Sequence, residues 1–268
     1  MWTRWITGLI ALPILIYIIS WGKGWILSGV VAIVAILALF EYFRMVFSQT
    51  QPVTRILFSG WGYVVSAWIV LSAAQGNPMG SWAGLFLEML GIGVITLNRF
   101  SQDSAVLDAI AKHVCGIVYI PLALSAIVWI HCTPAGVSWV YFLLAVVFAG
   151  DIGALYVGTY RGKHKLCPGI SPKKTIEGSV GGFAANLLVG LPIALLFLPK
   201  LSILQACIVI LSLGAASQIG DLFESVIKRT YGIKDSGNIL PGHGGMLDRI
   251  DALLFAAPLA WVFQTIWG

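Results

Sequence analysis

The sequence predicts an all-α polytopic integral membrane protein with about nine transmembrane helices and a cytoplasmic N-terminus. Of its 268 residues, 59% are hydrophobic and only 10% are charged. The mean hydropathy is +0.92, and the apolar residues form long uncharged runs. A helix needs about 20 such residues to cross the hydrocarbon of a bilayer. Transmembrane strands would instead give short alternating segments, which the sequence lacks.

Hydropathy divides the chain into nine expected spans. They cover residues 5–21, 24–41, 56–74, 82–98, 113–131, 138–158, 178–198, 202–227 and 250–267. The first has the positive start and apolar run of a signal peptide. No small-residue cleavage site follows it, however, and the next span begins at Gly24. We therefore expect the first span to be retained as a helix.

Positive charge falls almost entirely on one side of this topology. With the N-terminus in the cytoplasm, the loops 42–55, 99–112, 159–177 and 228–249 lie on the same side. All of the 16 Lys and Arg residues except Lys23 and Lys200 then face the cytoplasm. This asymmetry follows the positive-inside rule and supports the cytoplasmic N-terminus. We expect the protein to lie in a bacterial inner membrane with its active site facing the cytoplasm. The asymmetry also accounts for the net charge of +5 without nucleic-acid binding.

We expect the N-terminal and C-terminal parts of the chain to have different roles. Residues 1–112 are expected to be a transmembrane scaffold, and residues 113–268 a catalytic region that includes the loops 159–177 and 228–249. In the scaffold, Glu41, Arg44 and Arg55 flank helix ends and are expected to snorkel to the interface. Glu88 is a lone carboxylate in an apolar run, and either a structural hydrogen bond or a cavity would explain it.

The cysteines point to no disulfide or metal site. They are widely spaced, without a CxxC pair, and most lie in or beside apolar runs, as expected for small core residues. They are Cys115, Cys132, Cys167 and Cys207.

Asp151 is a carboxylate within the sixth span, where its insertion costs about 2.5–3.5 kcal/mol. Ala154 and Gly158 share its helix face, since they follow at i+3 and i+7. A face of such small residues can pack closely against another helix or line a cavity. We therefore expect a functional role for Asp151, with a structural one as the alternative.

The loop before the seventh span contains the run SPKKT. Its Ser171, Lys173, Lys174 and Thr175 precede a helix N-terminus, and this combination predicts a site for a phosphate ligand. It is not a P-loop, because the second glycine of GxxxxGK[ST] is missing and no strand is expected before it. The alternative is that the charge only holds the loop in the cytoplasm.

The stretch 221–251 concentrates the charge of the chain. It holds five of the 11 acidic residues, and a cluster of charge in so apolar a chain indicates function. On the eighth span, Asp221, Glu224, Ser225 and Lys228 form one helical stripe, and Asp248 and Asp251 share a face at the ninth. The acidic residues are Asp221, Glu224, Asp235, Asp248 and Asp251, and the basic ones Lys228, Arg229, Lys234 and Arg249.

Carboxylates brought together by two helices favour a hard cation such as Mg²⁺ between them. Asp221 and Asp248 are the first candidates for ligands, with Asp151 and Glu224 as further ones. The loop glycines, including Gly244 and Gly245, allow close backbone approach to phosphate oxygens. These features predict phosphoryl or nucleotidyl transfer. Glu224 and Lys228 could instead form an ordinary i, i+4 pair, and His243 could be an ordinary loop residue.

The same stretch resembles the signature of the phosphatidate cytidylyltransferases, or CDP-diacylglycerol synthases. That signature reads Ser-x-apolar-Lys-Arg, four residues, Lys-Asp, and then Pro-x-His-Gly-Gly-apolar-x-Asp-Arg-apolar-Asp. Every fixed position is filled, and SPKKTIEGSVGG upstream is also similar to this family. The filled positions are Ser225, Lys228, Arg229, Lys234, Asp235, Pro241, His243, Gly244, Gly245, Asp248, Arg249 and Asp251.

The resemblance implies a reaction in which CTP and phosphatidate give CDP-diacylglycerol and pyrophosphate. It also implies Mg²⁺ and a second cation thought to be K⁺, with Asp221 and Asp248 as metal ligands and the basic residues on the phosphates. A homodimer is compatible with this resemblance. The alternative function is an ion-coupled transporter that uses the intramembrane acids. A CDP-alcohol phosphotransferase would need a DGxxAR-type motif, which the sequence lacks.

Overall fold

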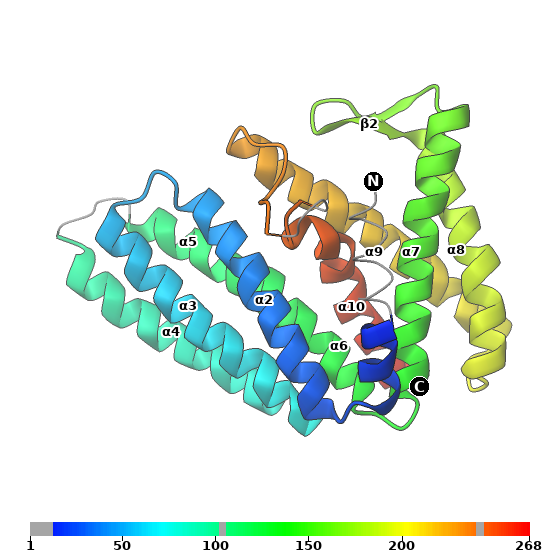
Figure 1. The fold of residues 1–268 in the computed structure, drawn as a ribbon, viewed down its shortest axis with the longest axis horizontal. Helices are drawn as coiled ribbons and strands as arrows, with labels where there is room; N and C mark the ends of the chain where they lie inside the picture. The colour runs from blue at the N-terminus through cyan, green and yellow to red at the C-terminus, as the bar shows by residue number, and fades with distance from the viewer. Residues whose placement is uncertain (1–12, 102–105, 240–243) are drawn as a thin grey trace. The chain divides into compact units, whose positions relative to one another are not determined.

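The computed structural model describes residues 13–101, 106–239 and 244–268. Arg4, Pro241 and His243 lie outside these ranges, as does the start of the expected first span, whose residues 13–21 are helical. The helices that follow are drawn in Figure 1. They are α2 (Gly24–Val46), α3 (Pro52–Ser72), α4 (Met79–Arg99), α5 (Val106–Ile117), α6 (Ala123–His131), α7 (Gly136–Arg161), α8 (Ile176–Phe197), α9 (Ile203–Thr230) and α10 (Leu247–Trp267).

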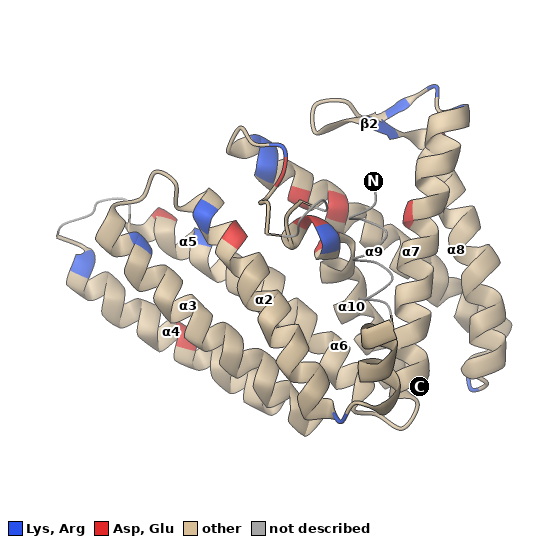
Figure 2. Cartoon of the chain, in the orientation of Figure 1, with Lys and Arg blue, Asp and Glu red and all other residues tan. Residues whose placement is uncertain are grey.

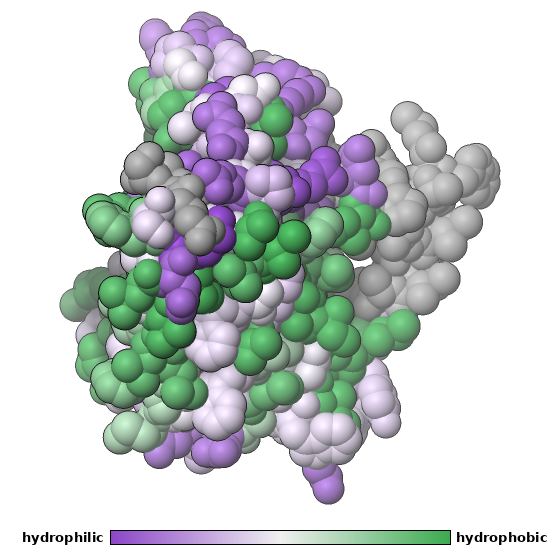
Figure 3. Space-filling view, turned by 90° about the vertical axis from the view of Figure 1, so that its left-hand side faces the viewer, coloured by the Kyte–Doolittle hydropathy of each residue, from purple (hydrophilic) through white to green (hydrophobic). Residues whose placement is uncertain are grey.

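The protein is a helical, polytopic membrane protein. Within the described ranges, eight helices are long and apolar enough to cross a bilayer, with Val106–His131 counted as one. They correspond to the second to ninth expected spans, and so confirm these. Several run further than expected, because a helix continues past the hydrocarbon into polar sequence. Figure 3 shows one face with a broad apolar zone in green, and hydrophilic residues in purple are gathered above this zone.

Helices α5 and α6 are joined without a break by a π-helical turn, η2 (Val118–Leu122). Pro121 lies inside this turn. Proline cannot donate a backbone N–H and crowds the preceding turn, and a wider helical turn accommodates it. The expected single span over 113–131 is therefore one continuous helix with a local change of pitch.

One part of the fold is not helical. Strands β1 (Lys165–Cys167) and β2 (Ser171–Thr175) form an antiparallel hairpin in which Lys165 pairs with Thr175 and Cys167 with Ser171. The N–H of Ile170 donates to the carbonyl of Cys167 and closes the turn, in which Pro168 occupies the second position that turns favour. The SPKKT run is thus a strand rather than an irregular loop, and the fold departs from all-α here.

The chain forms two compact units. Unit 1 comprises Met1–Cys132 and Asp235–Arg249, and unit 2 comprises Thr133–Lys234 and Ile250–Gly268. The helices α2 to α6 belong to unit 1, and α7, α8, α9, the hairpin and most of α10 belong to unit 2. The expected division at residue 112 concerns function and stays a prediction.

In unit 1, His113 is enclosed by aromatic rings and a carboxylate. Its ring centroid lies 5.0 Å from that of Phe43 and 5.4 Å from that of Phe58. Its Nε2 lies 2.8 Å from Oε1 of Glu88, and both side chains are buried. Buried polar groups are stable when a polar partner is close, so the contact with His113 supports the structural reading of Glu88.

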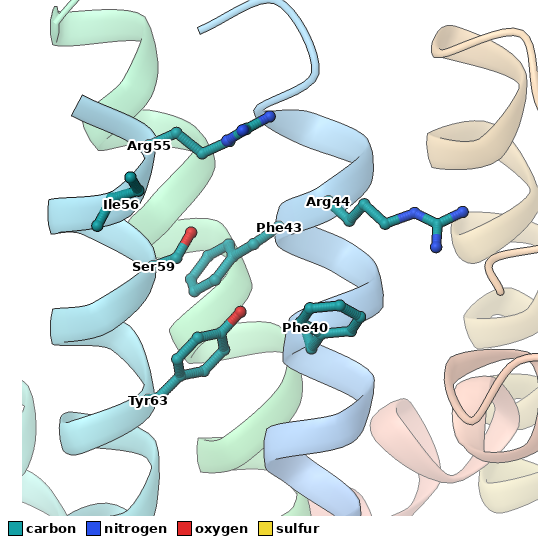
Figure 4. Close-up of a pocket in the computed structure, with 7 residues that line it drawn as sticks. All are labelled: Phe40, Phe43, Arg44, Arg55, Ile56, Ser59 and Tyr63. Atoms are coloured by element: carbon teal, nitrogen blue, oxygen red, sulfur yellow. The ribbon is translucent and has the colours of Figure 1, made fainter. Parts of the chain in front are cut away.

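A pocket of about 310 Å³ opens between α2 and α3, also in unit 1. The hydroxyls of Ser59 and Tyr63 point toward α2 there, whereas the side chain of Arg44 extends away from α3 and from Arg55 (Figure 4). The two guanidinium groups therefore do not converge on one point. None of the site residues expected from the sequence lines this pocket.

In unit 2, α7 and α8 pack together along much of their length. Gly150 and Gly153 of α7 have no room for a Cβ, since it would contact Asn186 and Ala185 of α8. Gly178 of α8 in turn lies against the carbonyl of Ala154. Small residues let two backbones approach closely, and Gly178 also lies against Gly158, so the predicted face packs against α8 at Ala154 and Gly158.

Candidate functional site

Lys174 and Asp221 bring two distant segments of unit 2 together. Lys174 lies on β2 and Asp221 on α9, and Nζ of Lys174 is 2.6 Å from Oδ2 of Asp221. Both side chains stay partly exposed, at 26% and 37%. The ion pair is therefore made at a surface that a ligand can reach, and an accessible ammonium can exchange a carboxylate for a phosphate oxygen.

Three carboxylates of unit 2 act on one another electrostatically. Asp221 interacts with Asp151 of α7 and with Asp251 of α10, and these two also interact with each other. Lys174 and Lys228 are the cations within reach of this group. Figure 2 marks acidic residues in red on α7 and α9. The structure thus joins Asp151 to the two predicted acids of the 221–251 stretch.

Glu224 and Lys228 form the simple helical pair that the sequence left open. The carboxylate of Glu224 contacts Nζ of Lys228 one turn later, and the Glu224 side chain is fully buried, at 0% exposure. Ser217 and Glu224 both lie on the buried side of α9. The contact supports the structural reading of Glu224, and Lys228 is turned toward this carboxylate.

The remaining predicted residues of the hairpin have local partners. Thr175 is buried and is the N-cap of α8, where its hydroxyl accepts the N–H of Gly178 at 3.1 Å. Arg229 of α9 donates to the carbonyls of Ile170 and Ile233, at 3.3 and 3.0 Å. Thr175 therefore fixes the start of α8, and Arg229 ties the tip of the hairpin to α9.

Other predicted residues differ in exposure. Lys173, Lys234, Asp235 and Arg249 are exposed, and Ser171 and Ser225 are half-buried. An exposed basic side chain can meet a soluble anion without further movement of the backbone. These positions agree with roles in substrate contact, which stay predictions.

In unit 1, Asp248 is held by backbone N–H groups. The N–H of Ser236 donates to its two oxygens at 3.3 and 3.1 Å, and the N–H of Gly245 donates to Oδ2 at 3.1 Å. Gly244 has a φ of +84°, a conformation that favours glycine. Ser236 and Gly245 therefore fix the carboxylate of Asp248 through their N–H groups.

Glu41 was expected at the membrane interface, and that prediction is wrong. Its side chain is only 2% exposed. Its Oε2 accepts the hydroxyl of Ser236 at 3.1 Å and the N–H of Leu247 at 2.9 Å. The sequence held one signal, since Glu41 shares a helix face with the buried Ala38 and Met45. The partners themselves lie about 200 residues away in the chain and could not be read from it.

The donors available for a metal are carboxylate oxygens. No group of three or more His, Cys, Asp or Glu side chains within residues 13–101, 106–239 and 244–268 could hold an ion by itself. The carboxylates of Asp151, Asp221 and Asp251 suit a hard cation that keeps water and substrate phosphates as its other ligands. Asp221 and Asp248 fall in different units, and their pairing over a metal stays a prediction.

Unit 2 thus brings Lys174 close to Asp221 and its neighbouring acids, a combination suited to phosphoryl or nucleotidyl transfer. Comparison with known proteins assigns the chain to a class with this chemistry. The sequence profile of the Cytidylyltransferase family matches residues 2–267. Because the match spans nearly the whole chain, the protein belongs to this family.

Several relatives are similar over their full length and carry the name phosphatidate cytidylyltransferase. The one from Staphylococcus haemolyticus (strain JCSC1435) is 35% identical over 264 residues, which cover 96% of each chain. The one from Staphylococcus aureus (strain COL) is 34% identical over 266 residues, again 96% of each. The one from Bacillus subtilis (strain 168) is 31% identical over 271 residues, covering 99% of this chain and 98% of the relative.

Proposed function

We propose that the protein transfers a cytidylyl group from CTP to phosphatidate, giving CDP-diacylglycerol and pyrophosphate. The observation that carries the proposal is the full-length similarity to bacterial proteins named phosphatidate cytidylyltransferase. A phosphate oxygen of phosphatidate forms a bond to the α-phosphorus of CTP. The bond from that phosphorus to the bridging oxygen of the β-phosphate breaks, and pyrophosphate leaves. The attacking phosphate is already an anion near neutral pH, so no protein base is required.

The lysines of unit 2 are proposed to bind the phosphates. Lys174 is the best placed, since its ammonium is partly exposed and is held 2.6 Å from Asp221. In this proposal the triphosphate displaces part of that ion pair, and Asp221 is released toward a cation. Lys173, Lys234 and Arg249 are exposed and would attract the anionic substrate.

Asp221, together with Asp151, Asp248 or Asp251, is proposed to hold Mg²⁺, with K⁺ as a second cation. When bound, Mg²⁺ would neutralise charge on the transferring phosphate and the leaving pyrophosphate. The oxygen donors fit such an ion. In this proposal Lys174 and the acids near Asp221 orient the substrate.

The reaction is proposed to take place at the cytoplasmic face of the inner membrane, with nine spans and a cytoplasmic N-terminus. The hairpin and residues 228–234 carry most of the basic residues of unit 2, and CTP is a cytosolic molecule. Phosphatidate would reach the site from the bilayer. This placement keeps both substrates next to the pairs formed by Lys174 and Lys228.

Turnover by the purified protein tests the activity. We expect pyrophosphate release that requires CTP, phosphatidate and Mg²⁺ together, with CDP-diacylglycerol formed in equal amount. Replacement of CTP by ATP and of phosphatidate by diacylglycerol are the matched controls. A folded preparation that releases no pyrophosphate, but moves ions in proteoliposomes, would refute the transferase and support the transporter.

Cysteine labelling tests the topology. In a background in which the four native cysteines are replaced by serine, a cysteine at Lys165 should resist an impermeant thiol reagent added outside intact cells. A cysteine at Lys200 should react. The reverse pattern would overturn the orientation, and permeabilised cells should label both positions.

A further inference from the structure

Glu41 of α2 lies in unit 1 beside the segment that carries Asp248. Its carboxylate is buried in a helix that is otherwise almost wholly apolar. Burying such a group is costly unless polar partners surround it. The partners here belong to the 235–247 segment, so the position of this carboxylate and that of the segment depend on each other.

Two contacts of Glu41 span the segment from end to end. Its Oε2 accepts the hydroxyl of Ser236 at 3.1 Å and the N–H of Leu247 at 2.9 Å. Leu247 is the first residue of α10, and the first N–H groups of a helix have no partner within it. Glu41 therefore acts as an N-terminal cap supplied by another helix, and its charge suits that end of the helix dipole.

Two glycines make this approach of the carboxylate feasible. A Cβ at Gly245 would lie 2.7 Å from Oε2 of Glu41, and one at Gly237 would lie 2.7 Å from its Cδ. Neither distance is one that real atoms adopt, so any side chain at these positions would push the carboxylate away. The glycines of the loop thus serve contact with Glu41 as well as backbone flexibility.

The residues that contact Glu41 also contact Asp248. Ser236 donates its hydroxyl to Glu41 and its N–H to Asp248, and Gly245 donates its N–H to Asp248 while packing against Glu41. Oε1 of Glu41 is buried and has no hydrogen-bond partner among the residues that the structure describes. The contacts that hold Asp248 are therefore themselves held by Glu41.

We infer that Glu41 is a positioning residue for the transfer reaction, which fixes the carboxylate of Asp248 through Ser236, Gly245 and the start of α10. The inference rests on the proposed function, in which Asp248 contributes to the cation site. Partners that orient a ligating carboxylate typically change metal affinity or activity by about 10- to 100-fold when they are removed. Glu41 thereby links helix α2, which is remote in the sequence, to the proposed cation ligand Asp248.

The test compares four variants with the wild-type protein. Glu41→Ala should lower kcat and raise the Mg²⁺ concentration for half-maximal activity, by about 10- to 100-fold in total. Glu41→Gln keeps an acceptor oxygen and should recover part of the loss. Ser236→Ala removes the bridging hydroxyl but leaves its N–H on Asp248, so its effect should be smaller. Glu88→Gln, an equally buried glutamate that contacts His113 instead, is the control and should leave kcat within twofold of wild type.

Hydrogen–deuterium exchange of peptides from residues 235–250 gives a second readout that needs no turnover. The amides of Gly245 and Leu247 should exchange about tenfold faster in Glu41→Ala and Ser236→Ala, and unchanged in Glu88→Gln. Wild-type kcat and exchange in Glu41→Ala would overturn the inference. If Glu41→Ala does not fold, wild-type behaviour of Ser236→Ala would overturn it instead. Absence of turnover in the wild-type protein would refute the proposed function, while the exchange result would still decide the role of Glu41 in holding the segment.

Discussion

Two acidic residues of unit 2 and two of unit 1 are held by different kinds of partner. In unit 2, Asp221 and Glu224 face the ammonium groups of Lys174 and Lys228. In unit 1, Asp248 and Glu41 accept N–H and hydroxyl groups from the 235–247 segment. An ammonium on a flexible side chain can move to a phosphate, whereas a backbone N–H cannot leave its place. The comparison suggests that unit 2 supplies exchangeable charge and unit 1 supplies fixed geometry.

The largest effect on turnover is expected from a substitution of Asp248. Asp248→Asn keeps an oxygen for the N–H groups of Ser236 and Gly245 but removes the charge proposed to face the cation. A cation contributes several kcal/mol to the transition state, so turnover should fall by about 1000-fold or more. Pyrophosphate release at saturating CTP measures this. Unaltered thermal unfolding would show that the fold is kept, and wild-type turnover would refute the metal assignment.

Substitutions of Lys174 and Asp221 should give the next largest effects. One should change KM and the other kcat. Lys174→Met removes the exchangeable ammonium, so KM for CTP should rise by about tenfold or more, the effect of losing one charged hydrogen bond. Asp221→Asn should lower kcat instead. A double-mutant cycle measures whether the two groups act together. Strict additivity of the two changes would contradict the proposed exchange of the ion pair.

Gly245→Ala tests the fixed geometry that we assign to unit 1. Its Cβ would meet Oε2 of Glu41 at 2.7 Å and the backbone N of Gly237 at 2.8 Å. Overpacking of this kind costs about 1–3 kcal/mol and should displace Asp248. We expect a lower Tm together with a loss of kcat. Gly232→Ala, a change at a glycine that has a positive φ and open space around it, should lower Tm alone.

The smallest effect on turnover is expected from Glu88. Removing one partner of a buried pair costs about 3–5 kcal/mol, so Glu88→Ala should markedly lower the stability of unit 1. The turnover per folded molecule should nevertheless match that of the wild-type protein. Thermal unfolding followed by an assay of the detergent-soluble, monodisperse fraction tests this. A fall in specific activity of that fraction would place the Glu88–His113 pair in the chemistry.

The sequence by itself determined the family and the eight spans that lie within the described residues. Apolar runs of about 20 residues have one stable outcome in a bilayer, since every backbone polar group must be satisfied within the helix. The signature from Ser225 to Asp251 is local, so it could be read residue by residue. Only the helix ends were displaced, as at α2, which continues five residues beyond its expected end at residue 41.

Only the tertiary structure decided which charges meet. The hairpin that carries Lys174 is too short to be recognised from alternation, and its cross-strand pairs fix the direction in which Lys174 faces Asp221. Glu41 looked like an interfacial residue because its partners, Ser236 and Leu247, are remote in the chain. Hydropathy reports how much a residue resists burial, but folding alone brings together the polar groups that make its burial stable.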